Sequence, residues 1–120
     1  MKIKKKSILI TFLGIVLFSC AYDKSYQEYK IDNLSKSISD TLIFQNESDM
    51  TGVEIIIIGN VNGRGMIEFE NGSGRFEKID LVNRVDEVYK TEWYESKMLF
   101  KYQPMDSINE GNLIIKYRAF

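Results

Sequence analysis

Residues 53–70 read VEIIIIGNVNGRGMIEFE, and this stretch carries the strongest information about the fold. β-Branched and aromatic residues dominate it, as is typical of strands. Asn62-Gly63 interrupts it, and Asn-Gly is the dipeptide favoured by a two-residue turn between antiparallel strands. We therefore predict a β-hairpin with strands at Val53–Val61 and Arg64–Glu70.

The register of this hairpin selects a core face. Counting outward from the turn places Ile58 opposite Ile67, so one face is apolar on both strands. Ile55 and Ile57 fall on the other face, opposite glutamates. Unless another segment covers them, we expect Ile55 and Ile57 to form an exposed apolar patch and a candidate ligand-binding surface.

Short runs of the same kind, separated by Gly, Asn and Asp, continue to the end of the chain. Further strands are predicted at Thr41–Gln45, Arg75–Val82, Val88–Tyr94, Lys97–Gln103 and Asn112–Phe120. Together they predict an all-β fold, an antiparallel β-sandwich of about seven strands over residues 41–120. A helix over 76–90 stays open as an alternative, because its apolar residues also fall within one helical stripe.

Residues 1–19 have the pattern of an export signal, with lysines at the start and an apolar run at Ile8–Phe18. That run has 11 residues, whereas a membrane-spanning helix needs about 20. Leu17, Ser19 and Cys20 then resemble the cleavage motif of bacterial lipoprotein precursors. The alternative is an ordinary signal peptide, with Cys20 left as a free thiol.

The resemblance implies cleavage before Cys20 and attachment of lipid to its sulfur, so that the membrane becomes a partner of the mature chain. It also implies a location in the cell envelope, and in the outer membrane of a Gram-negative host because Ala21 follows the cysteine. Residues 20–40 are polar without a sustained period, and we predict a flexible tether. A short helix at Tyr26–Lys30 that docks on the domain is the alternative.

Charge and composition narrow the possible functions. Four of the 16 basic residues lie in the leader, so the chain from Cys20 onward carries 12 of them against 17 acidic residues, a net charge of about −5. This argues against nucleic acid as a partner. The chain has no histidine and one cysteine, which excludes histidine-dependent nucleophilic catalysis. We expect no enzyme activity, no cofactor and no metal.

Trp93 and Tyr94 are the other candidate ligand-binding residues, because amphipathic aromatics are enriched in protein interfaces and sugar platforms. The spacing of Trp93-Tyr94, Pro104, Gly111 and the alternating C-terminal residues resembles small bacterial lipoproteins with a single β domain, and implies that fold without an activity. We predict a lipid-anchored module that binds an envelope protein or is structural. The alternative is a carbohydrate-binding accessory protein that uses the exposed aromatics.

Overall fold

The computed structural model describes residues 26–45, 49–107 and 110–120. This part of the chain is an antiparallel all-β fold without an α-helix, which confirms the predicted fold class. The six strands are β1 (Gln27–Ile31), β2 (Ile38–Ile43), β3 (Gly52–Glu70), β4 (Phe76–Glu92), β5 (Lys97–Pro104) and β6 (Gly111–Ala119). No helix within the described ranges is long and apolar enough to cross a membrane. The predicted leader and Cys20 lie outside these ranges.

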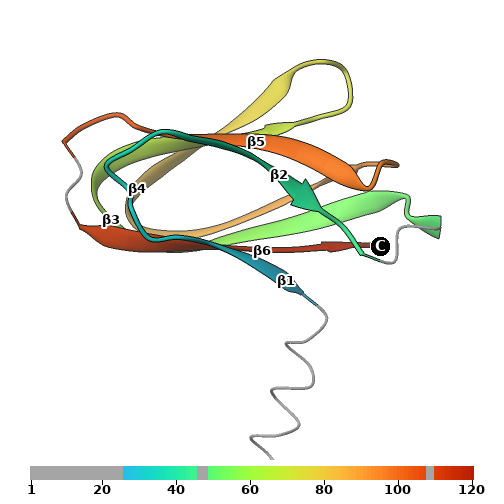
Figure 1. Ribbon diagram of the computed structural model, residues 1–120, viewed down its shortest axis with the longest axis horizontal. Coiled ribbons are helices and arrows are strands. Elements are labelled where there is room, and N and C mark those ends of the chain that lie inside the picture. Colours follow the sequence, from blue (N-terminus) through green and yellow to red (C-terminus); the bar gives the residue numbers. More distant parts are fainter. Residues whose placement is uncertain (1–25, 46–48, 108–109) are drawn as a thin grey trace, which may run out of the picture.

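β3 and β4 form a long hairpin that bends in its middle and runs through both layers of the molecule (Figure 1). On the edge of β3 away from β4, its first half pairs with β6 and its second half with β5. β1 extends the first layer beyond β6, and β2 extends the second beyond β5. The sheet is therefore folded over on itself into a sandwich, and β4 lies at the same edge of both layers.

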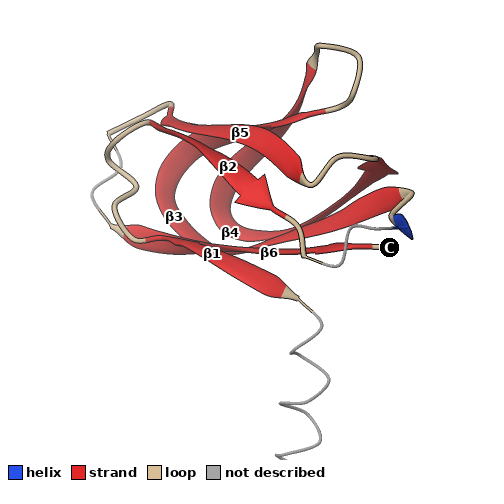
Figure 2. Cartoon of the chain, turned by 45° about the vertical axis from the view of Figure 1, so that its right-hand side comes forward, coloured by secondary structure: helices blue, strands red, loops and turns tan. Residues whose placement is uncertain are grey.

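Asn62-Gly63 lies inside β3, so the predicted two-residue turn is wrong. The chain bends here instead of reversing, and the register with β4 shifts at the bend. Gly59 has φ 152° and Gly63 has φ 123°, conformations that favour glycine. A Cβ atom on Gly59 would also lie 2.1 Å from the carbonyl oxygen of Asn112. The glycines therefore serve the curvature of one strand that has partners on both edges (Figure 2).

The continuous strand reverses the predicted inner and outer faces in the first half of β3, whereas Ile67 and Phe69 in the second half are buried as predicted. A two-residue turn would have joined Ile58 to Ile67 on the core side, whereas an uninterrupted strand keeps odd-numbered residues on one side throughout. Ile55 and Ile57 are fully buried, and Ile58 is 37% exposed. The apolar patch predicted at Ile55 and Ile57 is therefore wrong, because both residues belong to the core.

β4 is a single strand where two were predicted, and the alternative helix over 76–90 does not form. Leu81 and Val85 point into the core, and Tyr89 packs against it. These residues recur every four positions, a spacing that matches one face of a helix and equally, because it is even, one face of a strand. The segment is a strand and not a helix because it pairs with β3 along its length.

The segment predicted as a tether contains the first strand. β1 pairs with β6 from Gln27 to Ile31, and both Ile31 and Leu34 are buried in the core. The hydroxyl of Tyr102 donates to the carbonyl oxygen of Leu34 at 2.7 Å. The domain boundary predicted at residue 41 is therefore wrong for residues 26–40. A short edge strand with polar outward side chains leaves too weak a period in the sequence to be recognised.

Side chains join the two layers where β1 and β2 approach each other. The amide of Gln27 donates to the carbonyl oxygen of Ile43 at 2.7 Å and accepts from the N–H of Gln45 at 3.0 Å. The hydroxyl of Tyr29 donates to Asp40, and this bond raises the pKa of Tyr29 to about 12. On this side the sandwich is nearly closed.

Candidate functional site

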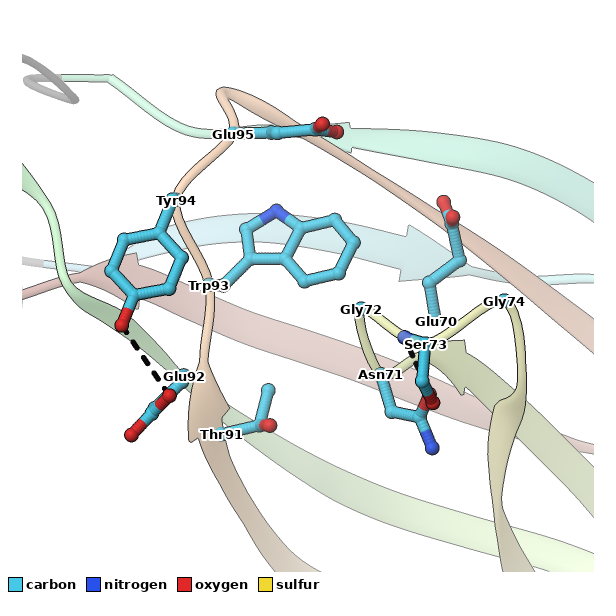
Figure 3. A pocket seen from close by; sticks show the side chains of 10 residues that line it. All are labelled: Glu70, Asn71, Gly72, Ser73, Gly74, Thr91, Glu92, Trp93, Tyr94 and Glu95. Carbon is cyan, nitrogen blue, oxygen red and sulfur yellow. Dashed lines mark hydrogen bonds between the residues drawn. The ribbon is translucent and has the colours of Figure 1, made fainter.

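A pocket of about 600 Å³ lies at the end of the sandwich away from the bend (Figure 3). Two connections form it, the β3–β4 turn over 71–75 and the β4–β5 connection over 93–96. Its lining residues are Glu70, Asn71, Gly72, Ser73, Gly74, Thr91, Glu92, Trp93, Tyr94 and Glu95. Both predicted aromatics are among them, whereas Ile55 and Ile57 are not.

The β3–β4 turn is held by its own hydrogen bonds. The side-chain oxygen of Asn71 accepts from the N–H and the hydroxyl of Ser73, at 3.3 and 2.8 Å. The N–H of Asn71 donates to the carbonyl oxygen of Arg75 at 3.1 Å. Gly72 and Gly74 have φ 84° and 78°, the left-handed conformation that a tight turn takes at glycine. One wall of the pocket is therefore an ordered loop.

Trp93 and Tyr94 have different roles although they are adjacent. Trp93 is buried, its N–H donates to the carbonyl oxygen of Thr51 at 3.2 Å, and its Nε1 donates to that of Lys97 at 3.1 Å. These bonds hold the β4–β5 connection in place. Tyr94 is 66% exposed, and its ring points away from that of Trp93 (Figure 3). Of the two predicted residues, only Tyr94 presents a whole ring to solvent.

The pocket is acidic. Glu92 and Glu95 are exposed, and the hydroxyl of Tyr94 donates to Glu92 at 3.3 Å. Glu70 is partly shielded and accepts a hydrogen bond of 2.6 Å from the N–H of Leu99. No basic side chain occurs among the described residues that line the pocket. The net charge around Tyr94 therefore favours a cationic or a neutral polar ligand over an anionic one.

Sequence reasoning missed a second polar cluster, on the outer face of the β1 layer. Glu54 is 8% exposed. Its Oε1 accepts from the hydroxyl of Tyr26 at 2.7 Å and from Nε of Arg118 at 2.8 Å, and Nζ of Lys90 lies 3.5 Å from Oε2. The hydrogen bond from Tyr26, with the charges of Arg118 and Lys90, lowers the pKa of Glu54 against the opposing effect of burial.

This cluster stabilises the fold and does not form an open binding site. The guanidinium of Arg118 also lies over the ring of Tyr26, 4.6 Å from its centroid. The carboxylate therefore ties the start of the described chain to β6 and β4. A lone glutamate within the apolar run 53–58 was the available signal, because a buried charge requires partners. No group of three or more potential metal ligands occurs within residues 26–45, 49–107 and 110–120.

Comparisons with known proteins give fold similarity alone. No protein-family model matches the chain, and no curated protein matches it by sequence. A subunit of the disulfide-linked pili that form Bacillus endospore appendages is similar over 78% of this chain and 85% of its own, at 13% identity and a TM-score of 0.49.

Two further solved structures show the range of these neighbours. A carbohydrate-binding module of Cellvibrio mixtus lichenase 5A, solved with cellotriose, is similar over 78% of this chain and 86% of its own, at 13% identity and a TM-score of 0.42. A periplasmic inhibitor of g-type lysozyme from Aeromonas hydrophila is similar over 80% and 87%, at 12% identity and a TM-score of 0.46. At these values the likenesses concern the all-β fold and carry no argument about a ligand.

Proposed function

We propose that this protein is a lipid-anchored, non-catalytic binding module of the cell envelope, and that a cationic segment of a partner protein binds beside Tyr94. The observation that carries the proposal is the pocket formed by two ordered connections and lined by an exposed tyrosine and carboxylates. Lipid on Cys20 would hold the module on the membrane, and in a Gram-negative host on the outer membrane.

The chemistry of the lining suits lysine or arginine side chains of a protein. An ammonium or guanidinium group gains from the face of an exposed tyrosine ring and from charge-assisted hydrogen bonds to carboxylates. Tyr94 supplies the ring, and Glu92 and Glu95 supply the carboxylates. Tyrosine is also among the residues that contribute most to protein–protein binding. A non-catalytic role accords with the lack of histidine.

A carbohydrate ligand is the second candidate, and the exposure of Tyr94 is the observation that favours it. A flat aromatic face beside carboxylate and amide groups can stack on a sugar ring and accept its hydroxyls. Trp93 does not add a second platform, because its ring is buried and its indole N–H is already bonded within the protein.

Binding measurements separate the two ligands. Short lysine- and arginine-rich peptides, acidic peptides of the same length and a glycan array serve as probes for the full chain in detergent. We expect the basic peptides to bind, and Tyr94→Ala or Glu95→Gln to weaken binding at least about tenfold, or about 1.4 kcal/mol. Met105→Ala is the control, because Met105 is exposed at the other end of the sandwich.

Two other binding results would change the proposal. Glycan binding that depends on Tyr94, without peptide binding, would replace the protein ligand by a sugar. Binding that survives both substitutions would remove the pocket from the proposal. The anchor is checked separately by mass spectrometry of the mature protein, where an unmodified thiol at Cys20 contradicts lipidation.

A further inference from the structure

One edge of β4 has no partner among the described residues, because β4 pairs with β3 alone. The N–H of Trp93 donates to β3's neighbouring residue Thr51, and the N–H of Asn71 donates to Arg75. The backbone N–H and C=O groups of the odd-numbered residues of β4 therefore point toward β3. Since backbone groups alternate between the two edges of a strand, the even-numbered residues direct their N–H and C=O groups to the open edge in both layers.

The side chains of these even-numbered residues form a regular sequence on the outer face of β4. From Lys78 to Glu92 the order is basic, acidic, valine, basic, acidic, valine, basic, acidic. The eight residues are Lys78, Asp80, Val82, Arg84, Asp86, Val88, Lys90 and Glu92, and all are exposed. Val82 and Val88 are 48% and 58% exposed.

We propose that β4 pairs antiparallel with β4 of a second copy of this chain, about a twofold axis at Val85. This register opposes Val82 to Val88 of the second copy. It also opposes a basic to an acidic residue at every other outward position, as Lys78 to Glu92, Asp80 to Lys90 and Arg84 to Asp86. The residues opposed are the ones whose backbone groups point at the open edge, so the same register satisfies the backbone ladder.

Neighbouring registers are unfavourable. An axis at Arg84 would oppose Arg84 to itself and Lys78 to Lys90, and an axis at Asp86 would oppose Asp86 to itself. Like charges directly opposite each other on antiparallel strands destabilise the pair. Axes at Val82 or Val88 also match charges, but they use only one arm of the strand. The axis at Val85 engages the outward residues from 78 to 92.

The fold of the monomer accommodates this pairing. Because β4 is the edge strand of both layers, a twofold axis at Val85, two residues beyond Asn83 at the bend (φ 52°), sets the first arm of one β4 beside the second arm of the other. Each layer then continues from one copy into the next, with four strands from each. Ile79 and Tyr89, which pack against the core but are only partly buried, would be covered further. A long open edge is otherwise a template for uncontrolled association.

A charge-exchange series tests the proposal by sedimentation of the full chain in detergent micelles. We expect a dimer for the native chain. Arg84→Asp or Asp86→Arg alone should raise the dissociation constant at least about tenfold, because each creates two like-charge pairs by symmetry. The double variant with both substitutions should restore the dimer. About an axis at Val82 it would instead oppose Lys78 to the new arginine, so rescue identifies the axis at Val85.

Controls distinguish a loss of the dimer from a loss of folding and from a general effect of charge. Arg84 and Asp86 are exposed and lie opposite Asn60 and Ile58 on β3, so we expect unchanged thermal unfolding of the monomer. Lys36→Asp, a charge reversal in the β1–β2 connection, should leave the dimer intact. A native chain that remains monomeric up to about 1 mM, single variants that stay dimeric, or a double variant that stays monomeric would each overturn the proposed pairing.

Discussion

The two sides of the sandwich end in different ways. Where β1 meets β2, the amide of Gln27 bonds to the backbone of the opposite layer, and Tyr29 bonds to Asp40. Where β4 forms the edge, no described strand pairs with its outer side in either layer, and charged side chains alternate along it. The chain therefore closes one side within the molecule through side chains. It leaves the other side with a self-complementary pattern that a second copy can complete.

The contacts on the closed side make residues 26–34 part of the domain. The substitution with the largest expected loss of stability tests this. Ile31→Ala should lower the free energy of unfolding by about 2–5 kcal/mol, because Ile31 is fully buried and the change leaves a cavity. Lys30→Ala, one residue away and exposed, should stay within about 0.5 kcal/mol. Chemical denaturation measures both. If both substitutions lower the stability by equally small amounts, residues 26–34 act as a tether and not as part of the domain.

The Glu54 cluster should give the next largest effect and a dependence on pH. Glu54→Gln should cost about 1–3 kcal/mol, because a shielded carboxylate with three partners becomes a neutral group. The folded pKa of Glu54 is lower than its ordinary value of 4.5. Its stabilising contribution is therefore complete above pH 4.5 and is lost as the pH falls through the folded pKa.

Denaturation of the native chain and of Glu54→Gln at several pH values checks this linkage. The difference between the two should shrink as the pH falls below 4.5. Glu28→Gln is the matched control, an exposed glutamate on β1, and should show no such loss. A difference that is constant down to the acid limit would mean that the carboxylate charge does not hold the cluster together.

The smallest effect compares the two sides directly. Gln27→Ala should cost about 0.5–1.5 kcal/mol, because it removes two hydrogen bonds between the layers. Val88→Ala on the open side should stay within about 0.5 kcal/mol when the chain is dilute and monomeric, since Val88 is mostly exposed. The same denaturation assay measures both variants. A larger loss at Val88 would show that the β4 edge is covered within one molecule.

Local sequence patterns predicted much of the strand content and part of the site. The predicted strands at 97–103 and 112–120 lie within about one residue of β5 and β6, because dense alternation of β-branched and aromatic residues is a local property. Tyr94 was predicted as a binding residue and lines the pocket. The loop at 71–75 was not, because only the sandwich brings it beside Tyr94. Glu92 and Glu95 were not predicted either, although they flank Trp93 and Tyr94 in the sequence.

The sequence by itself determined the all-β class and the absence of histidine chemistry. Only the tertiary structure decided whether Asn62-Gly63 reverses the chain or bends it. The local preference of Asn-Gly for a turn is small beside the ladders that β4, β5 and β6 form with the two halves of β3. Because side chains alternate along a strand, that one decision also placed Ile57 inside and Ile58 outside.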